Sequence, residues 1–246
     1  MEQFSIKPIV PLHIGHYDVS FTNQSLLMVV VVLAASAFLI LAMRGARLVP
    51  GRAQSMAEMM YEFVAGMINS TAGEEGLRFF PFVFTLFIFV LFCNFFGMVP
   101  WSFTVTSQLA VTFSLALLVM VTVIVTGFAK HGIGFLKLFV PDVPWYLLIL
   151  LVPIEVLSFF IRPISLSVRL FANMLAGHTM LAVFAGFVIL LGGAGGFVLP
   201  ALSVGPIFLI IAIILLELLV AFLQAYVFSM LTCIYLNEAL HLHDHH

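Results

Sequence analysis

The residues with the clearest chemical potential form a polar stripe through an apolar part of the chain. Arg169 lies in Ser167-Val-Arg-Leu-Phe-Ala-Asn-Met-Leu-Ala-Gly-His178, and its guanidinium stays charged at any physiological pH. A charge at the centre of a membrane helix costs ~3 kcal/mol on insertion scales, so an intramembrane charge usually has a function. Glu155, Arg162 and Arg169 are spaced by seven residues, and Asn173 follows Arg169 by four, so all four share one helix face. This pattern predicts an ion pathway with Arg169 as its fixed charge.

A second polar stripe lies in the last apolar stretch. Glu217, Gln224 and Glu238 are spaced by multiples of seven residues, and Tyr235 is in helical phase with Glu217. An antiparallel pairing of the two stretches would bring Glu217 and Gln224 to the depth of His178 and Arg169. His178, nine residues after Arg169, points to the opposite side of its helix. A histidine near an intramembrane carboxylate can pass a proton near neutral pH.

Ten residues are therefore candidates for the pathway. The main ones are Arg169, Asn173, His178, Glu217, Gln224 and Glu155. The lesser ones are Arg162, Ser158, Ser165 and Tyr235. The chain has no nucleotide-binding loop, zinc-protease motif or nucleophile elbow, so we expect no catalytic residue, cofactor or metal site.

Structural interpretations of the same residues remain open. Asn173 and Gln224 could be plain hydrogen bonds between helices, worth under ~1 kcal/mol each. Glu155 could pair with Arg162 only to neutralise it, or Arg162 could extend its charge to the cytoplasmic interface. Arg169 has no acidic residue one turn away, so we expect its partner elsewhere, including on another subunit.

The composition indicates a chain surrounded mainly by lipid. Of its 246 residues 63% are hydrophobic and only 8% are charged, whereas soluble domains carry about 25% charged residues. The long unbroken apolar runs differ from the alternating pattern of transmembrane barrels. The net charge of −2 gives no indication of nucleic-acid binding. We predict a single-domain, all-α polytopic membrane protein.

Five apolar runs organise the chain, at residues 25–43, 79–99, 107–128, 146–191 and 200–236. The first three match the ~20 residues needed to cross ~30 Å of hydrocarbon. The last two would be about 69 Å and about 55 Å long as single helices, so each must fold back or tilt steeply. The glycine-rich break at 192–196, followed by Pro200, favours a hairpin of two long tilted helices joined outside the membrane.

A further segment, residues 53–70, is predicted to be an amphipathic helix along the cytoplasmic interface. Its apolar face consists of Met56, Met59, Met60, Phe63 and Met67. Orientation follows from the basic residues, since six of them share one side if the first three runs each cross once. They are Arg44, Arg47, Arg52, Arg78, Lys130 and Lys137. That side is then cytoplasmic, with the N-terminus outside and the C-terminus in the cytoplasm.

Four stretches resemble one known family. Residues 163–178, Pro-Ile-Ser-Leu-Ser-Val-Arg-Leu-Phe-Ala-Asn-Met-Leu-Ala-Gly-His, are similar to the signature of subunit a of rotary proton-translocating ATP synthases. Residues 217–228 and 231–236 resemble the family's last helix, and residues 94–100 resemble its second-crossing signature. Many bacterial members carry Glu at the position of His178 and His at that of Glu217. The exchange found here is similar to alphaproteobacterial and mitochondrial members.

The resemblance implies a non-catalytic stator subunit that carries protons through two half-channels to and from a ring of c subunits. Proton flow would thereby drive ring rotation and ATP synthesis. By resemblance, Arg169 is the family's essential arginine. The external half-channel would be lined by Asn173, His178, Glu217 and Gln224. The cytoplasmic access route would be lined by Glu155, Ser158 and Ser165.

The implied partners are the c-ring, the peripheral-stalk b subunits, the catalytic sector and membrane lipid. The implied location is a bacterial plasma (inner) membrane, with the mitochondrial inner membrane as the alternative. Two other functions compete with this interpretation. A self-contained proton-coupled secondary transporter would show an inverted repeat, and none is visible in the sequence. A membrane anchor without a transport role would not need Arg169.

Overall fold

The computed structural model describes residues 8–10, 13–14, 17–18, 20–45, 47–98, 105–132, 134–135, 145–193 and 204–240. Its helices are α1 (Asn23–Met43), α2 (Arg52–Gly76), α3 (Phe80–Gly97), α4 (Leu109–His131), α5 (Trp145–Gly192) and α7 (Val204–Leu240). Two short 3₁₀ turns, η2 (Leu77–Phe79) and η3 (Val105–Ser107), precede α3 and α4. Four strands of two or three residues precede α1, namely β1 (Pro8–Val10), β2 (His13–Ile14), β3 (Tyr17–Asp18) and β4 (Phe21–Thr22).

The predicted fold class is confirmed, because the described chain is almost entirely helical. Five of its segments are long and apolar enough to cross a membrane, counting α2 and α3 together as one run from Arg52 to Gly97. The sequence pattern did not reveal the short strands. They form two antiparallel pairs, β1 with β4 and β2 with β3.

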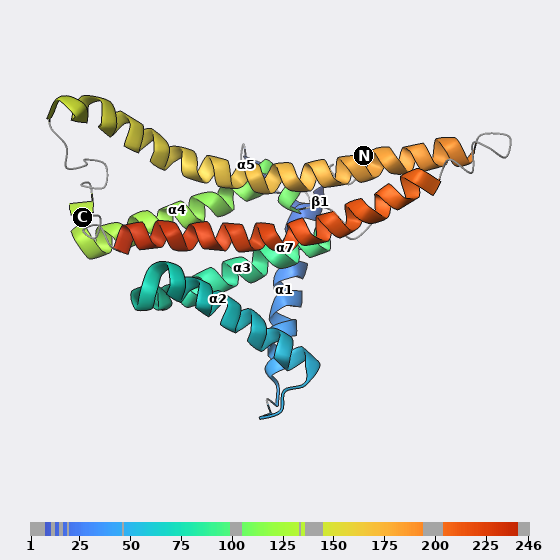
Figure 1. Ribbon diagram of the computed structural model, residues 1–246, viewed down its shortest axis with the longest axis horizontal. Helices are drawn as coiled ribbons and strands as arrows, with labels where there is room; N and C mark the ends of the chain where they lie inside the picture. The colour runs from blue at the N-terminus through green and yellow to red at the C-terminus, as the bar shows by residue number, and fades with distance from the viewer. Residues whose placement is uncertain are drawn as a thin grey trace.

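Helix α1 has the length and surface of a single membrane crossing. Its first turn is capped by Thr22, whose hydroxyl accepts a hydrogen bond from the Ser25 amide at 3.4 Å. At 1.5 Å per residue its 21 residues span about 31 Å. Only Val31 and Ala35 are buried, so most of its apolar surface is left for lipid. In Figure 1 it runs across the direction of α5 and α7.

Helices α5 and α7 are the two longest elements and lie side by side (Figure 1). The run expected at 146–191 lies within one continuous helix of 48 residues, and the described part of the run expected at 200–236 lies within one of 37 residues. Pro153 and Pro163 lie inside α5 without ending it. Most of the glycine-rich turn expected between the two helices, together with Pro200, lies outside the described residues.

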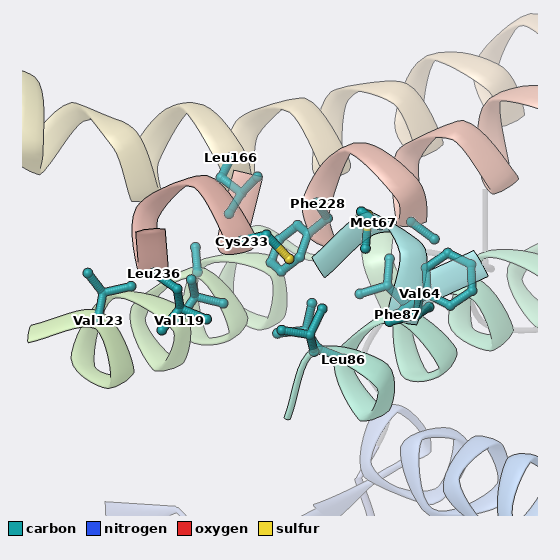
Figure 2. Close-up of a cluster of buried hydrophobic side chains, with 14 of the residues drawn as sticks. Val64, Met67, Leu86, Phe87, Val119, Val123, Leu166, Phe228, Cys233 and Leu236 are labelled. Carbon is teal, nitrogen blue, oxygen red and sulfur yellow. The ribbon is translucent and has the colours of Figure 1, made fainter. Parts of the chain in front are cut away.

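The core surrounds the C-terminal half of α7. Side chains from α2, α3, α4, α5 and α7 meet there (Figure 2). They include Val64 and Met67 of α2, Leu86 and Phe87 of α3, Val119 and Val123 of α4, Leu166 of α5, and Phe228, Cys233 and Leu236 of α7. The N-terminal half of α7 exposes large apolar residues such as Phe208, Leu215 and Leu219. One end of α7 is therefore fixed by packing, while much of the apolar surface of the other end is left to the surroundings.

Helix α2 buries a different face from the one its periodicity suggested. Of the five residues expected on its apolar face only Met67 is buried, while Met56, Met59 and Phe63 are exposed. The packed stripe instead consists of the smaller or β-branched residues Ala57, Val64, Ile68 and Ala72. Small side chains let α2 approach its neighbours closely, so the longer methionines remain available to other surroundings. The expected interfacial position of this helix stays a prediction.

Candidate functional site

The site is built on the antiparallel register of α5 and α7. Three polar side-chain contacts between described residues define this register. The residue numbers of the contacting residues rise along α5 and fall along α7. Arg162 pairs with Glu238, the Asn173 amide donates to Gln224 Oε1 at 2.9 Å, and His178 faces Glu217. The expected antiparallel pairing therefore holds for Glu217 and Gln224, whereas the pairing of Arg162 with Glu238 was not predicted.

His178 and Glu217 form a buried acid–base pair. The distance from His178 Nε2 to Glu217 Oε1 is 3.8 Å, and the two side chains are only 11% and 6% exposed. This separation is too long for a direct hydrogen bond, but one water or a small side-chain movement could join the groups. The pair can therefore exchange a proton along a very short path.

Helix α3 supplies a third wall that the sequence did not reveal. Asn94 is fully buried, and its Nδ2 donates a hydrogen bond to the Ala221 carbonyl of α7 at 3.1 Å. Ala221 lies one turn beyond Glu217. The backbone of Gly97, at the end of α3, hydrogen-bonds the His178 side chain. The signal for Asn94 in the sequence is a polar residue inside an apolar run. Asn94 begins the stretch at 94–100 that resembles the family's second-crossing signature.

Polar atoms without partners concentrate at this three-helix junction. Among the described residues, Asn94 Oδ1, Glu217 Oε1 and Gln224 Nε2 are buried and make no hydrogen bond. An unsatisfied buried polar group costs about 1–3 kcal/mol, and bound water usually removes this cost. Buried polar atoms of this kind can bind water, so this junction is polar enough to hold it.

Gly177 makes room for the Glu217 carboxylate. A Cβ at this position would lie 2.7 Å from Glu217 Oε1 and 3.0 Å from Glu217 Cδ. Any side chain here would push the carboxylate away from its present place beside His178. The sequence offered no signal for this role, because the clash depends on which residue of α7 faces the glycine.

Arg169 lies at the edge of the packed face of α5 and is open to the surroundings. The helix packs through Phe159, Leu166, Leu170 and Met174, all buried. Arg169 is exposed, and within the part of the chain that is described it makes no hydrogen bond or ion pair. The expectation that the partner of Arg169 lies elsewhere, including on another subunit, stays a prediction.

Arg162 has the partner that Arg169 lacks. It pairs with Glu238 of α7, with both side chains about one-quarter exposed, and it lies over the Tyr235 ring at 5.1 Å. The interpretation that Glu155 neutralises Arg162 is wrong, since the carboxylate that does so is on the other helix. Tyr235 is also near enough to Arg169 for the two side chains to interact electrostatically.

The remaining candidates lie on α5, toward its N-terminal side from Arg169. Glu155 is half-buried, whereas Ser158 and Ser165 are exposed. The structure does not join these residues into a cluster, and their place in an ion path stays a prediction. Asn173 is exposed as well, although its amide is held by the buried Gln224.

Comparisons with known proteins agree with this arrangement. A family model described as ATP synthase A chain matches residues 25–237. A protein of Mesorhizobium japonicum named ATP synthase subunit a is 60% identical over 242 residues, covering 98% of this chain and 96% of the relative. Proteins of the same name from Allorhizobium ampelinum and Chelativorans are 59% and 60% identical over 244 and 247 residues, covering 97% and 98% of this chain and 96% and 97% of the relatives.

The organisms are alphaproteobacteria, as the exchanged His178 and Glu217 suggested. The resemblance seen in the sequence is thus confirmed over nearly the full length of the chain. With its three-helix polar junction and this extent of identity, the chain belongs to the ATP synthase A chain family.

Proposed function

We propose that this chain is the proton-channel stator of an ATP synthase membrane sector, with Arg169 as the fixed charge that rotor carboxylates pass. One observation supports the proposal most strongly. Arg169 is open to the surroundings at the edge of the packed face of α5, while the buried acid–base pair of His178 and Glu217 lies toward α7. Family membership also supports it, and nothing comparable supports a self-contained transporter.

In this proposal, a proton enters from outside through the junction of α3, α5 and α7. Asn173, His178, Glu217 and Gln224 line this route, and water on the unsatisfied atoms of Glu217 and Gln224 carries the proton. The proton then neutralises a carboxylate on the c-ring. A neutral carboxyl can move into lipid without the large penalty of a buried charge, so the ring can turn.

After nearly a full turn the carboxyl loses its proton to the cytoplasmic side, past Glu155, Ser158 and Ser165. Arg169 attracts each arriving carboxylate in its ionised form, so the proton must leave before the site passes. Because a guanidinium does not give up its own proton, Arg169 also separates the two half-channels and prevents a leak. The membrane potential contributes ~2.3 kcal/mol per charge per 100 mV to this cycle.

The proposed placement in the membrane follows from helix length and charge. A helix of 48 residues is about 72 Å long and can cross ~30 Å of hydrocarbon only at a steep tilt. The arginines after α1 and before α3 favour a cytoplasmic position for those ends, with the N-terminus outside and the C-terminus inside. The membrane is a bacterial plasma (inner) membrane. The partners are the c-ring, the b subunits of the peripheral stalk and the catalytic sector.

The acid–base pair provides the direct test of the entry route. His178→Leu and Glu217→Leu should each slow ATP-driven acidification of inverted vesicles by about tenfold or more, since positioned proton transfer contributes a factor of 10²–10⁴. The pH–rate profile should also change, because a titrating group has been removed. Thr179→Val is a matched control on α5, since this exposed hydroxyl bonds only its own helix. Unchanged pH–rate profiles in both leucine variants would remove the pair from the path.

A further inference from the structure

We propose that a hollow beside the Glu75–Lys130 ion pair binds the headgroup of an anionic phospholipid. The hollow has a volume of about 420 Å³, within the range of ligand-binding pockets. It lies where the end of α2 and η2 meet α4 and the last residue of α7. This site is separate from the proton path and does not depend on it.

The charges at the hollow favour an anion. Arg78 and Lys130 both line it, against a single carboxylate, Glu75. Lys130 is paired with Glu75, whereas Arg78 makes no hydrogen bond or ion pair among the described residues. A guanidinium can bind two phosphate oxygens at once, and the lysine ammonium keeps further donors beyond its bond to Glu75.

The walls of the hollow are held in place by contacts between helices. The Glu75–Lys130 pair joins α2 to α4. On the other side, His131 Nε2 donates a hydrogen bond to the Leu240 carbonyl at 3.2 Å, which fixes the end of α7 against α4. The two cations are therefore presented on a built surface between three helices and not on a free loop.

Apolar residues indicate that the anion carries an acyl chain. Phe79, Val125 and Leu240 line the same hollow. From Val125 an exposed apolar stripe continues along α4 through Val121 and Phe128, which are 54% and 44% exposed and share its helix face. A phospholipid can place its phosphate at Arg78 and its chains along this stripe, whereas a free phosphate would leave the stripe uncovered. Basic pockets between transmembrane helices bind anionic lipid headgroups in just this way.

The test measures lipid binding to the detergent-purified, delipidated ATP synthase complex. The probe is phosphatidylglycerol with a fluorescent acyl chain, and phosphatidylcholine with the same chains is the uncharged comparison. Each basic residue near a lipid surface contributes about a fivefold change in affinity. Arg78→Gln should weaken binding by about that factor, and Glu75→Gln should tighten it similarly, because Lys130 is released. Arg52→Gln is the matched control, since this exposed arginine begins α2 far along the helix from the hollow.

Weaker lipid binding in Arg78→Gln and tighter binding in Glu75→Gln, with unchanged affinity in Arg52→Gln, would support the lipid site. Equal affinities in all three variants and the parent would overturn it, as would equal competition by phosphatidylcholine. Competition by glycerol phosphate at the same concentration as the lipid would identify a free-phosphate site instead and would also overturn the proposal. If an acidic protein segment fills the hollow, Arg78→Gln would reduce recovery of that partner and leave the lipid titration unchanged, which contradicts the lipid assignment.

Discussion

Gly177→Ala tests whether proton transfer depends on the position of the Glu217 carboxylate, because the change adds only one methyl carbon beside that group. The added Cβ would lie 2.7 Å from Oε1, and an ordinary contact begins at 3.4 Å. The carboxylate must therefore move by about 0.7 Å, at a cost of about 0.5–1.5 kcal/mol if it leaves its preferred rotamer. The backbone is not strained, since alanine favours a helix more than glycine does.

The expected effect is on proton transfer and not on assembly. A misplacement approaching 1 Å can cost on the order of 10²-fold when reacting groups must be aligned. We therefore expect ATP-driven acidification of vesicles to fall by roughly tenfold to a hundredfold, while the amount of assembled complex stays normal. Shortening the acid in Gly177→Ala/Glu217→Asp should restore part of the rate, because the shorter side chain relieves the clash.

Gly186→Ala is the matched control, since it lies on the same helix and a Cβ there meets nothing within 4 Å. This variant should acidify vesicles at the parent rate. If Gly177→Ala also matched the parent, the tight placement of Glu217 beside α5 would have no role in transport. If both alanine variants failed to assemble, the effect would come from α5 itself, and the reasoning from the carboxylate would be wrong.

Two further predictions concern contacts that join other helices to α7. Arg162→Gln and Glu238→Gln should each destabilise the membrane sector by about 1–3 kcal/mol, because either change leaves a half-buried charge without its partner. The double variant should lose less stability than the sum of the two single variants. Additive shifts of the melting temperature would show that the pair is not coupled. Asn94→Leu should cost roughly 1 kcal/mol and slow proton pumping, because it removes the bond to the Ala221 carbonyl and a polar atom of the junction. Parent pumping rates in Asn94→Leu would exclude α3 from the entry route.

The long helices could be predicted from the sequence because length and periodicity are properties of one segment. The run at 146–191 contains no strong turn, which favours one long helix over a segment that folds back, and α5 is that helix. Heptad spacing likewise placed Glu217 and Gln224 opposite the polar face of α5, since two antiparallel helices must bring residues of equal depth together. Neither argument needed the details of side-chain packing.

The other features of the site depend on contacts between helices. The residue pattern of a single helix carries no information about such contacts. The pattern of α5 alone offers Glu155 as the acidic partner of Arg162, whereas the actual partner, Glu238, lies on α7. Asn94 and Gly177 act through residues on other helices, so neither stood out by spacing. On α2 the large methionines dominated the periodicity, whereas close packing selected smaller residues such as Ala57.

The central claim is that Arg169 is the fixed charge past which rotor carboxylates move, and proton pumping by Arg169→Ala and Arg169→Lys tests it most directly. Inverted vesicles carrying the assembled complex would be supplied with ATP, and internal acidification would be followed with a pH-sensitive dye. Arg169→Ala should abolish acidification and allow passive proton flow, because nothing then separates the half-channels. Arg169→Lys should retain little activity, since an ammonium lacks the permanent charge and the planar fork of a guanidinium. Normal acidification in both variants would contradict the account.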